Sequence, residues 1–542
     1  MNQALAKPGK LCSKRKPLSL GIRQATMAAV MVAAAAPQAY ALNFQLDNGM
    51  TIDLDTTLTY DAQWRMQDQS KEILEFGGLG ELTDDGNRNF DEGDMTQNRV
   101  SFGTDFDANY GDGGVFVRAR GWYDEIYDDG DLARESFQQD GIDEHKSKIE
   151  FLDAFWYHNF ALGDRNLSLR VGEQVVNWGE SLFLQGGIST AMGPLDATKA
   201  NAPGTELKDI FMPIGQVYAE MTLTDNLSLG AYYQYDWEAT RIDAPGTYFN
   251  ILDGFGQKSV GDQFGGPVLG VDLPVTEDEP DEGQYGIALR YLAENLNSTE
   301  FGFYYLNYND FTPSLQVFSN PALGGSIGMN HEYFEDIDLY GLSFGTVFGD
   351  VNVSGEISYR DGSPVQIVDT FGGFLFAPAE TVQTQVSAIY ILPQNPLADN
   401  MSFTGEIGYN RVLDIDMPNG HPRNSSKLKD QIARKNDIGA ASAVVSLKAD
   451  YFNIIGGLDM SVTGTYRNDF SGRSSTSYTF TEDNEQFALK TDFTYLGKHK
   501  FGASYVWFLA NPKDIIKDDD TLAFGNLNAD RDYLAAYYKY SF

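Results

Sequence analysis

The chain has few of the residues that usually reveal a covalent scaffold or a catalytic site. Among 542 residues there is a single cysteine, Cys12, and there are five histidines. One thiol excludes an intramolecular disulfide. The histidines, at positions 145, 158, 331, 421 and 499, lack the H-E-x-x-H spacing of a zinc site, and the sequence contains no G-x-x-x-x-G-K-[ST] phosphate loop.

Basic residues are scarce as well. Lysine and arginine together number 39, against 77 aspartates and glutamates, and the formal net charge is −38. So acidic a chain repels nucleic acid, and no nucleic-acid partner is expected. Aromatic residues nevertheless make up 13% of the sequence, and this apolar content excludes a disordered chain.

The first 41 residues differ from the rest. Residues 1–24 contain six lysines or arginines and no acid, residues 25–36 (ATMAAVMVAAAA) are apolar, and residues 39–41 read AYA. This order is typical of a cleaved secretory signal peptide, and the apolar run is too short for a membrane-spanning helix. We expect residues 1–41 to be removed on export and residues 42–542 to form one domain.

Most of residues 42–542 alternates between apolar and polar positions. In residues 50–66 (MTIDLDTTLTYDAQWRM), Ile52, Leu54, Leu58 and Tyr60 share one face of an extended chain. Similar segments recur along the sequence, without a long apolar stripe of 3.6-residue period. The pattern predicts β-strands with one apolar and one polar face.

The connections between these segments alternate in length. Eight are short, among them GDGG at 111–114, TDN at 224–226 and GKHK at 497–500, and nine are longer. Short turns at one end and long loops at the other are typical of bacterial outer-membrane barrels. In lipid, only a closed sheet pairs every backbone group of its strands. The sequence therefore predicts an all-β, transmembrane, antiparallel up-and-down barrel of about 18 strands, alternatively 16, with long extracellular loops and short periplasmic turns.

The chain ends on a strand pattern, YLAAYYKYSF at 533–542. Tyr538, Tyr540 and Phe542 fall on one face, with Lys539 and Ser541 on the other. A closing strand with a terminal aromatic residue is typical of outer-membrane barrels. We predict that these three aromatic residues form the signal read by the barrel-insertion machinery.

Charged residues of both signs occupy the faces predicted to point inward. The predicted lumen residues are Arg99, Asp105, Arg118, Arg120, Arg290, Glu356 and Arg360. Such charges either join neighbouring strands or select a solute, and both roles stay open.

Three long connections are more apolar than loops in water usually are: 179–214, 311–329 and 363–378. Apolar loops either fold into a lumen or form a binding surface. We interpret 179–214 as a plug or lining that receives an apolar or amphipathic molecule. The alternative is that these loops pack on one another and brace the barrel mouth. The candidate lining residues are Trp178, Phe183, Leu184 and Phe211 as apolar contacts, with Glu180 and Lys208 as polar gates.

Two further patterns bear on chemistry. GGSIG at 324–328 matches the nucleophile elbow G-x-S-x-G around Ser326, but no helix pattern follows it, so no enzyme is predicted. DDGNRNFDEGD at 84–94 resembles the start of a calcium loop, with Phe90 in place of the turn glycine. A structural calcium ion and an acidic loop closed by its own side chains are both open there. The candidate calcium ligands are Asp85, Asn87, Asn89 and Asp91.

Four stretches together resemble a proteobacterial outer-membrane barrel family that is catalogued as domain of unknown function thirteen-oh-two. They are DDGNRNFDEGD at 84–94, RVGEQVVNWGES at 170–181 leading into PGTELKDIFMPI at 203–214, SYRDGSPVQI at 358–367, and the ending DRDYLAAYYKYSF. The resemblance spans essentially all of residues 42–542. It implies a barrel often encoded beside permeases of the resistance-nodulation-division (RND) type and a periplasmic partner, and it carries no residue roles.

These observations lead to one preferred function. We expect a barrel in the outer membrane of a Gram-negative bacterium, in contact with lipopolysaccharide, that conducts or docks hydrophobic or amphipathic small molecules or lipids. An RND-type permease and a periplasmic carrier are the expected partners. The alternatives are a general diffusion porin and a structural barrel that transports nothing.

Overall fold

The computed structural model describes residues 42–542 except 75–83, 129–131, 133–138, 252–262, 265–272, 321–325, 369–374, 434–435, 477–479 and 513–526. The expected signal peptide, residues 1–41, lies outside the described residues. No helix within the described residues is both long enough and apolar enough to cross a membrane.

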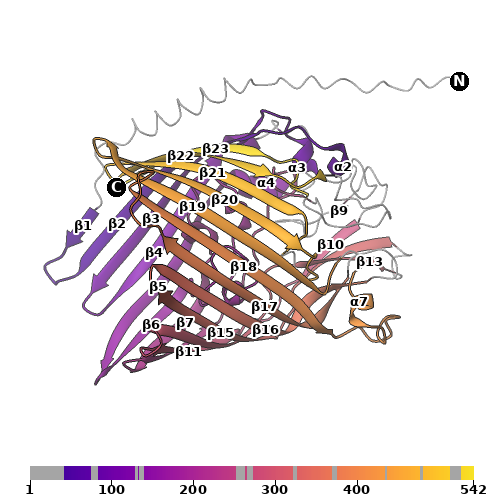
Figure 1. The fold of residues 1–542 in the computed structure, drawn as a ribbon, viewed down its shortest axis with the longest axis horizontal. Helices are drawn as coiled ribbons and strands as arrows, with labels where there is room; N and C mark the ends of the chain where they lie inside the picture. The colour runs from indigo at the N-terminus through magenta and orange to yellow at the C-terminus, as the bar shows by residue number, and fades with distance from the viewer. Residues whose placement is uncertain are drawn as a thin grey trace.

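The described strands form a closed barrel (Figure 1). One sheet contains 19 strands, of which all but β1 (Leu42–Gln45) make an antiparallel barrel of 18. The predicted barrel of 18 strands is confirmed, and the alternative of 16 is wrong. The barrel strands are β2 (Thr51–Arg65), β3 (Met95–Tyr110), β4 (Gly113–Asp124), β5 (Ser147–Leu162), β6 (Arg165–Gln174), β7 (Ile214–Thr224), β8 (Leu227–Gln234), β11 (Tyr285–Ala293), β12 (Thr299–Tyr308), β15 (Ile337–Phe348), β16 (Val351–Ile367), β17 (Leu375–Ile391), β18 (Asn400–Ile415), β19 (Gly439–Ile455), β20 (Leu458–Ser471), β21 (Asn484–Tyr495), β22 (His499–Phe508) and β23 (Tyr533–Ser541).

The barrel closes where its first and last strands meet. β2 pairs with β23 in an antiparallel register from Thr57↔Ser541 to Arg65↔Tyr533. Phe542 extends this pairing, since its backbone N–H donates to the Thr56 carbonyl at 2.9 Å and its carbonyl accepts from the Thr56 N–H at 2.8 Å. Because β2 pairs with β23 as well as with β3, every barrel strand has a partner on both sides. β1 forms a hairpin with the start of β2.

The connections differ at the two ends of the barrel. Eight described hairpins, from β3–β4 to β21–β22, turn tightly at one end, here called the short-turn end, and nine connections lie at the other, the long-loop end. This is the predicted alternation. The connections contain the helices α2 (Lys71–Leu74), α3 (Asp85–Arg88), α4 (Gln139–Lys146), α5 (Leu207–Ile210) and α7 (Leu428–Gln431), and the 3-10 turns η3 (Glu125–Tyr127), η4 (Ile188–Ala191) and η5 (Ala197–Lys199).

Two of the apolar segments expected to be loops are largely strands. β13 (Ser314–Asn320) and β14 (Ser326–Glu332) lie within 311–329 and beyond, and they form a second sheet with β9 (Gln263–Phe264) and β10 (Leu273–Asp278). Most of 363–378 belongs to β16 and β17, which continue past the barrel wall, and residues 369–374 are outside the described part. Their apolar character comes from burial, because Val365, Ile367 and Ala377 pack with Ile415 and Ile432.

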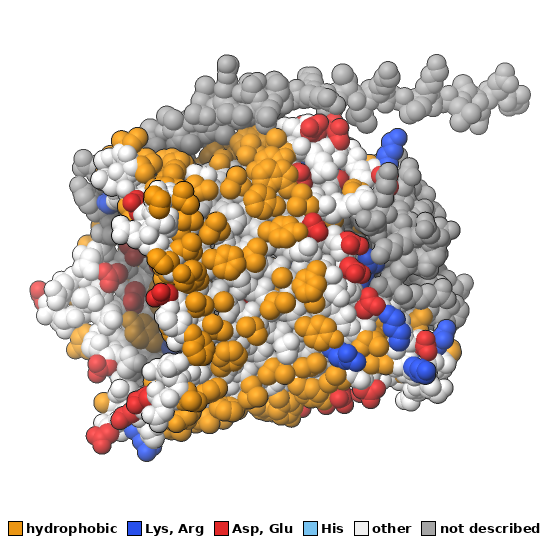
Figure 2. Space-filling view, in the orientation of Figure 1, with side chains coloured by type: hydrophobic (Ala, Val, Ile, Leu, Met, Phe, Trp, Pro, Cys, Tyr) orange, Lys and Arg blue, Asp and Glu red, His pale blue; other side chains and the backbone are white. Residues whose placement is uncertain are grey.

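The outer surface of the barrel is apolar around the strands. Figure 2 shows hydrophobic side chains covering the visible barrel wall, with charged side chains gathered towards its two ends. On β18 the exposed side chains, Phe403, Ile407 and Tyr409, are at odd-numbered positions. Glu406 and Asn410, at even-numbered positions, are buried inside. This is the reverse of a soluble barrel, and it is the arrangement that a strand needs when one face meets lipid.

The alternation on β18 generates a direct test of which face meets lipid. Replacing the exposed Ile407 by arginine (Ile407→Arg) is expected to lower the free energy of unfolding in lipid vesicles by roughly 2–4 kcal/mol, because the charge enters hydrocarbon. Thr404→Arg, on the inner face of the same strand, is the matched control and is expected to cost less. The measurement is a urea unfolding titration of both variants; equal losses would contradict the assignment of faces.

Candidate functional site

The connection between β6 and β7, residues 175–213, crosses the interior of the barrel and is here called the lumen loop. Its first half contacts the wall formed by β16, β17 and β18, and its second half contacts β2, β4 and β23. These strands lie in different parts of the sheet order. The loop therefore joins distant parts of the wall through the lumen.

Two inward glutamates hold the backbone of the first half. Glu356 on β16 accepts hydrogen bonds from the N–H groups of Glu180 at 2.6 Å and Ile188 at 2.9 Å. Glu406 on β18 accepts from three consecutive N–H groups, those of Leu182 (3.0 Å), Phe183 (2.6 Å) and Leu184 (2.8 Å). A hydrogen bond to a charged acceptor contributes about 1.5–3 kcal/mol, so this pair of carboxylates is a strong anchor.

The carbonyl groups of the same stretch meet donors from the wall. Gln385 on β17 donates to the Leu184 carbonyl at 3.0 Å, and Gln383 donates to the Gln185 carbonyl at 2.7 Å. Arg360 on β16 donates to the Gly187 carbonyl at 2.7 Å. Buried backbone polar groups need partners, and here inward side chains supply them in place of a β-ladder.

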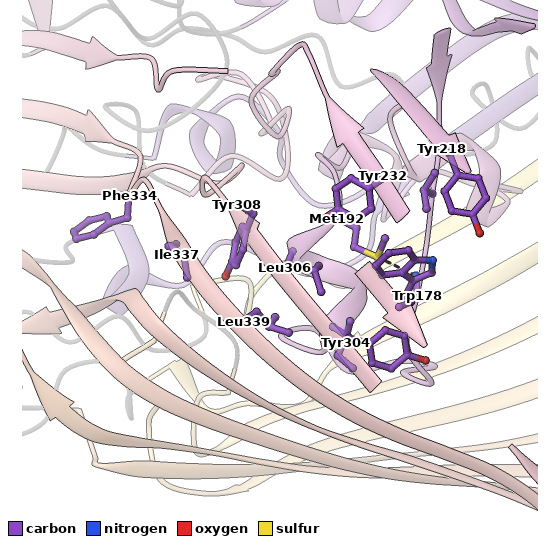
Figure 3. Close-up of a cluster of buried hydrophobic side chains, with 14 of the residues drawn as sticks. Trp178, Met192, Tyr218, Tyr232, Tyr304, Leu306, Tyr308, Phe334, Ile337 and Leu339 are labelled. Atoms are coloured by element: carbon purple, nitrogen blue, oxygen red, sulfur yellow. Dashed lines mark hydrogen bonds between the residues drawn. The ribbon is translucent and has the colours of Figure 1, made fainter. Parts of the chain in front are cut away.

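The apolar side chains of the loop pack on the adjoining wall (Figure 3). Trp178 lies against Tyr232 and Tyr304, with ring centroids 5.2 Å and 5.9 Å away, and its backbone N–H points to the Met192 sulfur at 3.0 Å. On β15, Gly341 leaves room for Ile188, because a Cβ at that position would lie 2.8 Å from the Ile188 side chain. The loop and this wall form one buried cluster.

The second half of the loop is held mainly by charge. Arg120 on β4 bonds the Asp196 carboxylate at 2.5 Å and the Asp209 carbonyl at 2.9 Å. Glu206 lies 3.3 Å from the ammonium group of Lys539 on β23. Gln63 on β2 donates to the Asn201 carbonyl at 2.9 Å.

Four of the five predicted lumen arginines form ion pairs, while Arg360 donates hydrogen bonds to the Tyr308 and Ser358 hydroxyls and the Gly187 carbonyl. Arg99 bonds Asp124 at 3.3 Å, and Arg120 also bonds Glu150 at 2.6 Å. Arg118 joins Asp105 on β3 at 2.7 Å to Asp153 on β5 at 3.0 Å. Arg290 lies 3.9 Å from Glu220. The pairs of Arg99, Arg118 and Arg120 link neighbouring strands or hold the lumen loop, and that of Arg290 reaches from β11 across β8 to β7.

Two cavities flank the lumen loop. One, of about 320 Å³, lies on its short-turn side between β2, β3, β4 and β23; its lining includes Asp55 and Ser541 near the short turns and Trp122 further in. The other, of about 190 Å³, lies on the long-loop side and is lined by residues including Gln185, Tyr308 and Gln383. The loop thus separates a cavity at each end of the lumen.

Two neighbouring groups of the loop, Lys199 and Asp196, have shifted pKa values. Burial, together with the nearby Arg99, lowers the pKa of Lys199 to about 7, and its ammonium group lies 4.1 Å from the centre of the Trp122 ring. Burial alone would raise the pKa of the Asp196 carboxyl, but Lys199 and Arg120 outweigh it and the pKa is lowered. Asp196 therefore stays ionised at neutral pH, while Lys199 gains or loses its proton close to neutral pH.

The predicted lining residues have different surroundings. Trp178 and Leu184 are buried at 2% and 1% exposure, so they pack against the wall and do not face open space. Phe183 is 40% exposed. The side chain of Lys208 is half exposed and lies 3.6 Å from Glu206. Glu180 and Phe211 are partly buried, and Phe211 forms a β-bridge with Leu195 inside the loop.

The predicted calcium segment folds around two buried arginines. The Oδ1 atom of Asn87 accepts from Arg65 at 2.6 Å, and Asn89 donates to the Gly246 carbonyl at 2.9 Å. Arg531 forms an ion pair with Asp84, at the start of the segment. The oxygen of Asn87 is thus occupied, and no group of three or more His, Cys, Asp or Glu side chains suited to a metal occurs among the described residues.

The backbone at Ser326 does not form a nucleophile elbow. Ser326 begins β14, opposite Asn320 of β13, and the chain continues as a strand to Glu332. An elbow requires a turn that leads into a helix. Residues 321–325, which include the first two residues of the motif, lie outside the described part.

Several residues of this site were not predicted. Gln383, Gln385, Lys199 and Trp122 are neutral, aromatic or within a loop, and no spacing in the sequence sets them apart. The inward position of Gln383 and Gln385 follows from the alternation along β17, but their contact with the lumen loop depends on which loop enters the barrel.

The glutamate anchors generate a second prediction. A barrel carrying both Glu356→Ala and Glu406→Ala is expected to release the first half of the lumen loop, because five backbone N–H groups lose their acceptor. Chymotrypsin should then cut after Phe183 or Leu184, in the released half, at least ten-fold faster, on the order of the hydrogen-bond energies lost, as followed by mass spectrometry.

Glu294→Ala is the control, because Glu294 lies in the β11–β12 turn at the short-turn end. A doubly substituted barrel as resistant to chymotrypsin as this control would show that the glutamates do not hold the loop.

Comparisons with known proteins place the chain in a family. No curated protein matches it. Among solved structures, it is similar to Pseudomonas aeruginosa OccK11 (OpdR), at 10% identity and a TM-score of 0.40, covering 91% of this chain and 96% of that one. It is also similar to Acinetobacter baumannii OccAB1, at 12% identity and a TM-score of 0.41, covering 94% of this chain and 99% of that one.

The chain also resembles the Acinetobacter baumannii outer membrane channel DcaP, at 12% identity and a TM-score of 0.37, covering 92% of this chain and 99% of that one. At such values these likenesses carry no conclusion about this chain. The family model described as Protein of unknown function (DUF1302) matches residues 22–542. The resemblance found in the sequence is confirmed, and the chain belongs to this family.

Proposed function

We propose that the protein is an outer-membrane channel in which the lumen loop controls the passage of small amphipathic molecules. The observation that carries the proposal is the pair of glutamates, Glu356 and Glu406, that hold this loop between two cavities. The apolar outer surface supports a place in lipid, since it would be unfavourable in water.

The lining of the lumen supports amphipathic solutes. On the lumen loop, Leu182 and Phe183 expose 43% and 40% of their surface. The cavity at the short-turn end combines Leu152 and Pro203 with arginines and lysines, and the other cavity combines Phe311 with Arg360. Apolar surface next to a few charged groups suits a molecule that has both characters.

The partners are part of the proposal. The described fold contains no nucleotide-binding element, so passage would follow a gradient or depend on another protein. An RND-type permease and a periplasmic carrier would supply that direction, and the strand ending at Phe542 would be read by the barrel-insertion machinery. Lipopolysaccharide would surround the acidic long-loop end.

A general diffusion porin is the second candidate, favoured by the charged groups that line the cavity at the short-turn end. Its selectivity would depend on solute size and charge and not on apolar character. The ion pairs that occupy Arg99, Arg118 and Arg120 weaken this candidate, because a paired arginine attracts solutes less strongly.

Passage through proteoliposomes distinguishes the two candidates. The wild-type barrel is expected to admit octanoate faster than glucose, and replacing residues 182–212 by a short Gly-Ser linker is expected to raise the rates of both and abolish the preference. Fluorescent or radiolabelled uptake provides the measurement. If trimming the loop leaves the passage of every solute unchanged, the loop does not control the channel.

A further inference from the structure

Three lysines surround one carboxylate of the lumen loop. The Glu206 carboxylate lies 3.3 Å from Lys539, 3.8 Å from Lys500 and 3.6 Å from Lys208, measured to each ammonium nitrogen. Lys500 and Lys539 belong to β22 and β23, while Glu206 and Lys208 belong to the loop. In a chain with a net charge of −38, this cluster carries local positive charge.

The cluster favours an anion. Burial alone would raise the pKa of the Glu206 carboxyl, but Lys539, Lys208 and Lys500 outweigh it and the pKa is lowered. Glu206 is therefore ionised at neutral pH and neutralises one of the three ammonium groups. Because two positive charges remain, a second anion, or one that replaces Glu206, would be attracted to the same place.

The cluster borders the cavity of about 320 Å³ at the short-turn end. Its volume falls in the range of about 300–1,000 Å³ that small-molecule sites occupy. Apolar surface comes from Trp122, Leu152 and Pro203, and hydroxyl groups line the β2 and β23 side, where Thr57, Thr59 and Ser541 lie. A ligand with an anionic group at Lys500 and Lys539 would have its body in this space.

The deep end of the cavity contains an unsatisfied polar atom. Asp61 on β2 is 6% exposed, and its Oδ1 atom has no hydrogen-bond partner among the described residues. Leaving such an atom buried and unpaired costs about 1–3 kcal/mol. Lys199 lines the same end and is also buried, at 9% exposure. A hydroxyl or amine on the ligand would supply the donor that Asp61 lacks.

We propose that this cavity binds a small organic carboxylate whose anionic group replaces Glu206 between Lys500 and Lys539 and whose far end donates a hydrogen bond to Asp61. Glu206 is then an internal stand-in for the ligand. Ligand binding detaches the second half of the lumen loop from β22 and β23, so occupancy and loop position are linked. The inference rests on the proposed channel, whose solute class it narrows to hydroxylated or aminated carboxylates.

The probe for the test is trans-4-hydroxycyclohexanecarboxylate, which is soluble in water and carries both groups. Its binding to the full barrel in lipid nanodiscs is measured by isothermal titration calorimetry, with the neutral carboxamide of the same ring as comparison. We expect the carboxylate to bind and the carboxamide to bind roughly ten-fold more weakly or not at all, as the loss of a charge-assisted contact implies.

Variants of the cluster give effects of opposite sign. Lys500→Gln and Lys539→Gln are expected to weaken binding about five-fold, and Glu206→Gln to tighten it by a similar factor, as expected for partly exposed charge pairs. Lys448→Gln is the matched control: its side chain is 47% exposed, against 48% for Lys500, and Lys448 bonds Asp450 on its own strand. The control should bind as the wild type does.

Asp61→Ala tests the deep end separately, since it should remove the preference for the hydroxylated probe over plain cyclohexanecarboxylate. Absence of binding to both the wild type and Glu206→Gln would overturn the proposal, and so would equal losses in Lys448→Gln and Lys500→Gln. Passage of solutes without probe binding would refute this inference and leave the proposed function standing. Probe binding in a barrel that passes no solute would support the binding site and refute the proposed function as a channel.

Discussion

The interior of this barrel depends on carboxylates that accept hydrogen bonds from a backbone belonging to another part of the chain. Glu356 and Glu406 are buried in the wall, where an unpaired charge would be costly. The N–H groups of the lumen loop satisfy them, and they in turn satisfy a stretch of backbone that has no strand partner. Neither the glutamates nor the loop would be stable in place without the other.

This constraint explains how an apolar loop can lie in a polar lumen. Its backbone is paired with Glu356, Glu406, Gln383 and Gln385, so its side chains are free to pack on the tyrosines and leucines of the adjoining strands β8, β12 and β15. At β23 the second half is held by the ion pair of Glu206 and Lys539, which water reaches more easily because the Glu206 side chain is 42% exposed. The loop is thus firmly anchored at one wall and more weakly at the other, which suits an element that moves.

Much of the fold follows from the sequence, because a strand between lipid and water must alternate with period two. The alternation on residues 50–66 and the short turns such as TDN at 224–226 gave the strand number and the faces. The same pattern did not predict the strands within 311–329 and 363–378. There β13, β14 and the ends of β16 and β17 extend beyond the barrel and are buried on more than one side. An apolar strand there cannot be told from an apolar loop.

The candidate site could be predicted only in part. The inward position of Glu356 follows from the strand pattern, but its role depends on contact with residues 180 and 188, more than 160 positions away in the chain. The same limit applies to 84–94, where the contact of Asn87 with Arg65 and that of Asp84 with Arg531 join distant parts of the chain. A single sequence does not contain such long-range pairing.

The central claim is that the lumen loop must leave the wall for a solute to pass. Gln63→Cys and Asn201→Cys place thiols at a contact between β2 and the more weakly held second half of the loop. Cys12, in the expected signal peptide, is the only other cysteine of the chain. Single-channel conductance and octanoate flux would be recorded before and after joining the thiols with a short reversible linker. We predict that linking abolishes octanoate flux and that reduction restores it. Undiminished flux through the linked barrel would contradict the account.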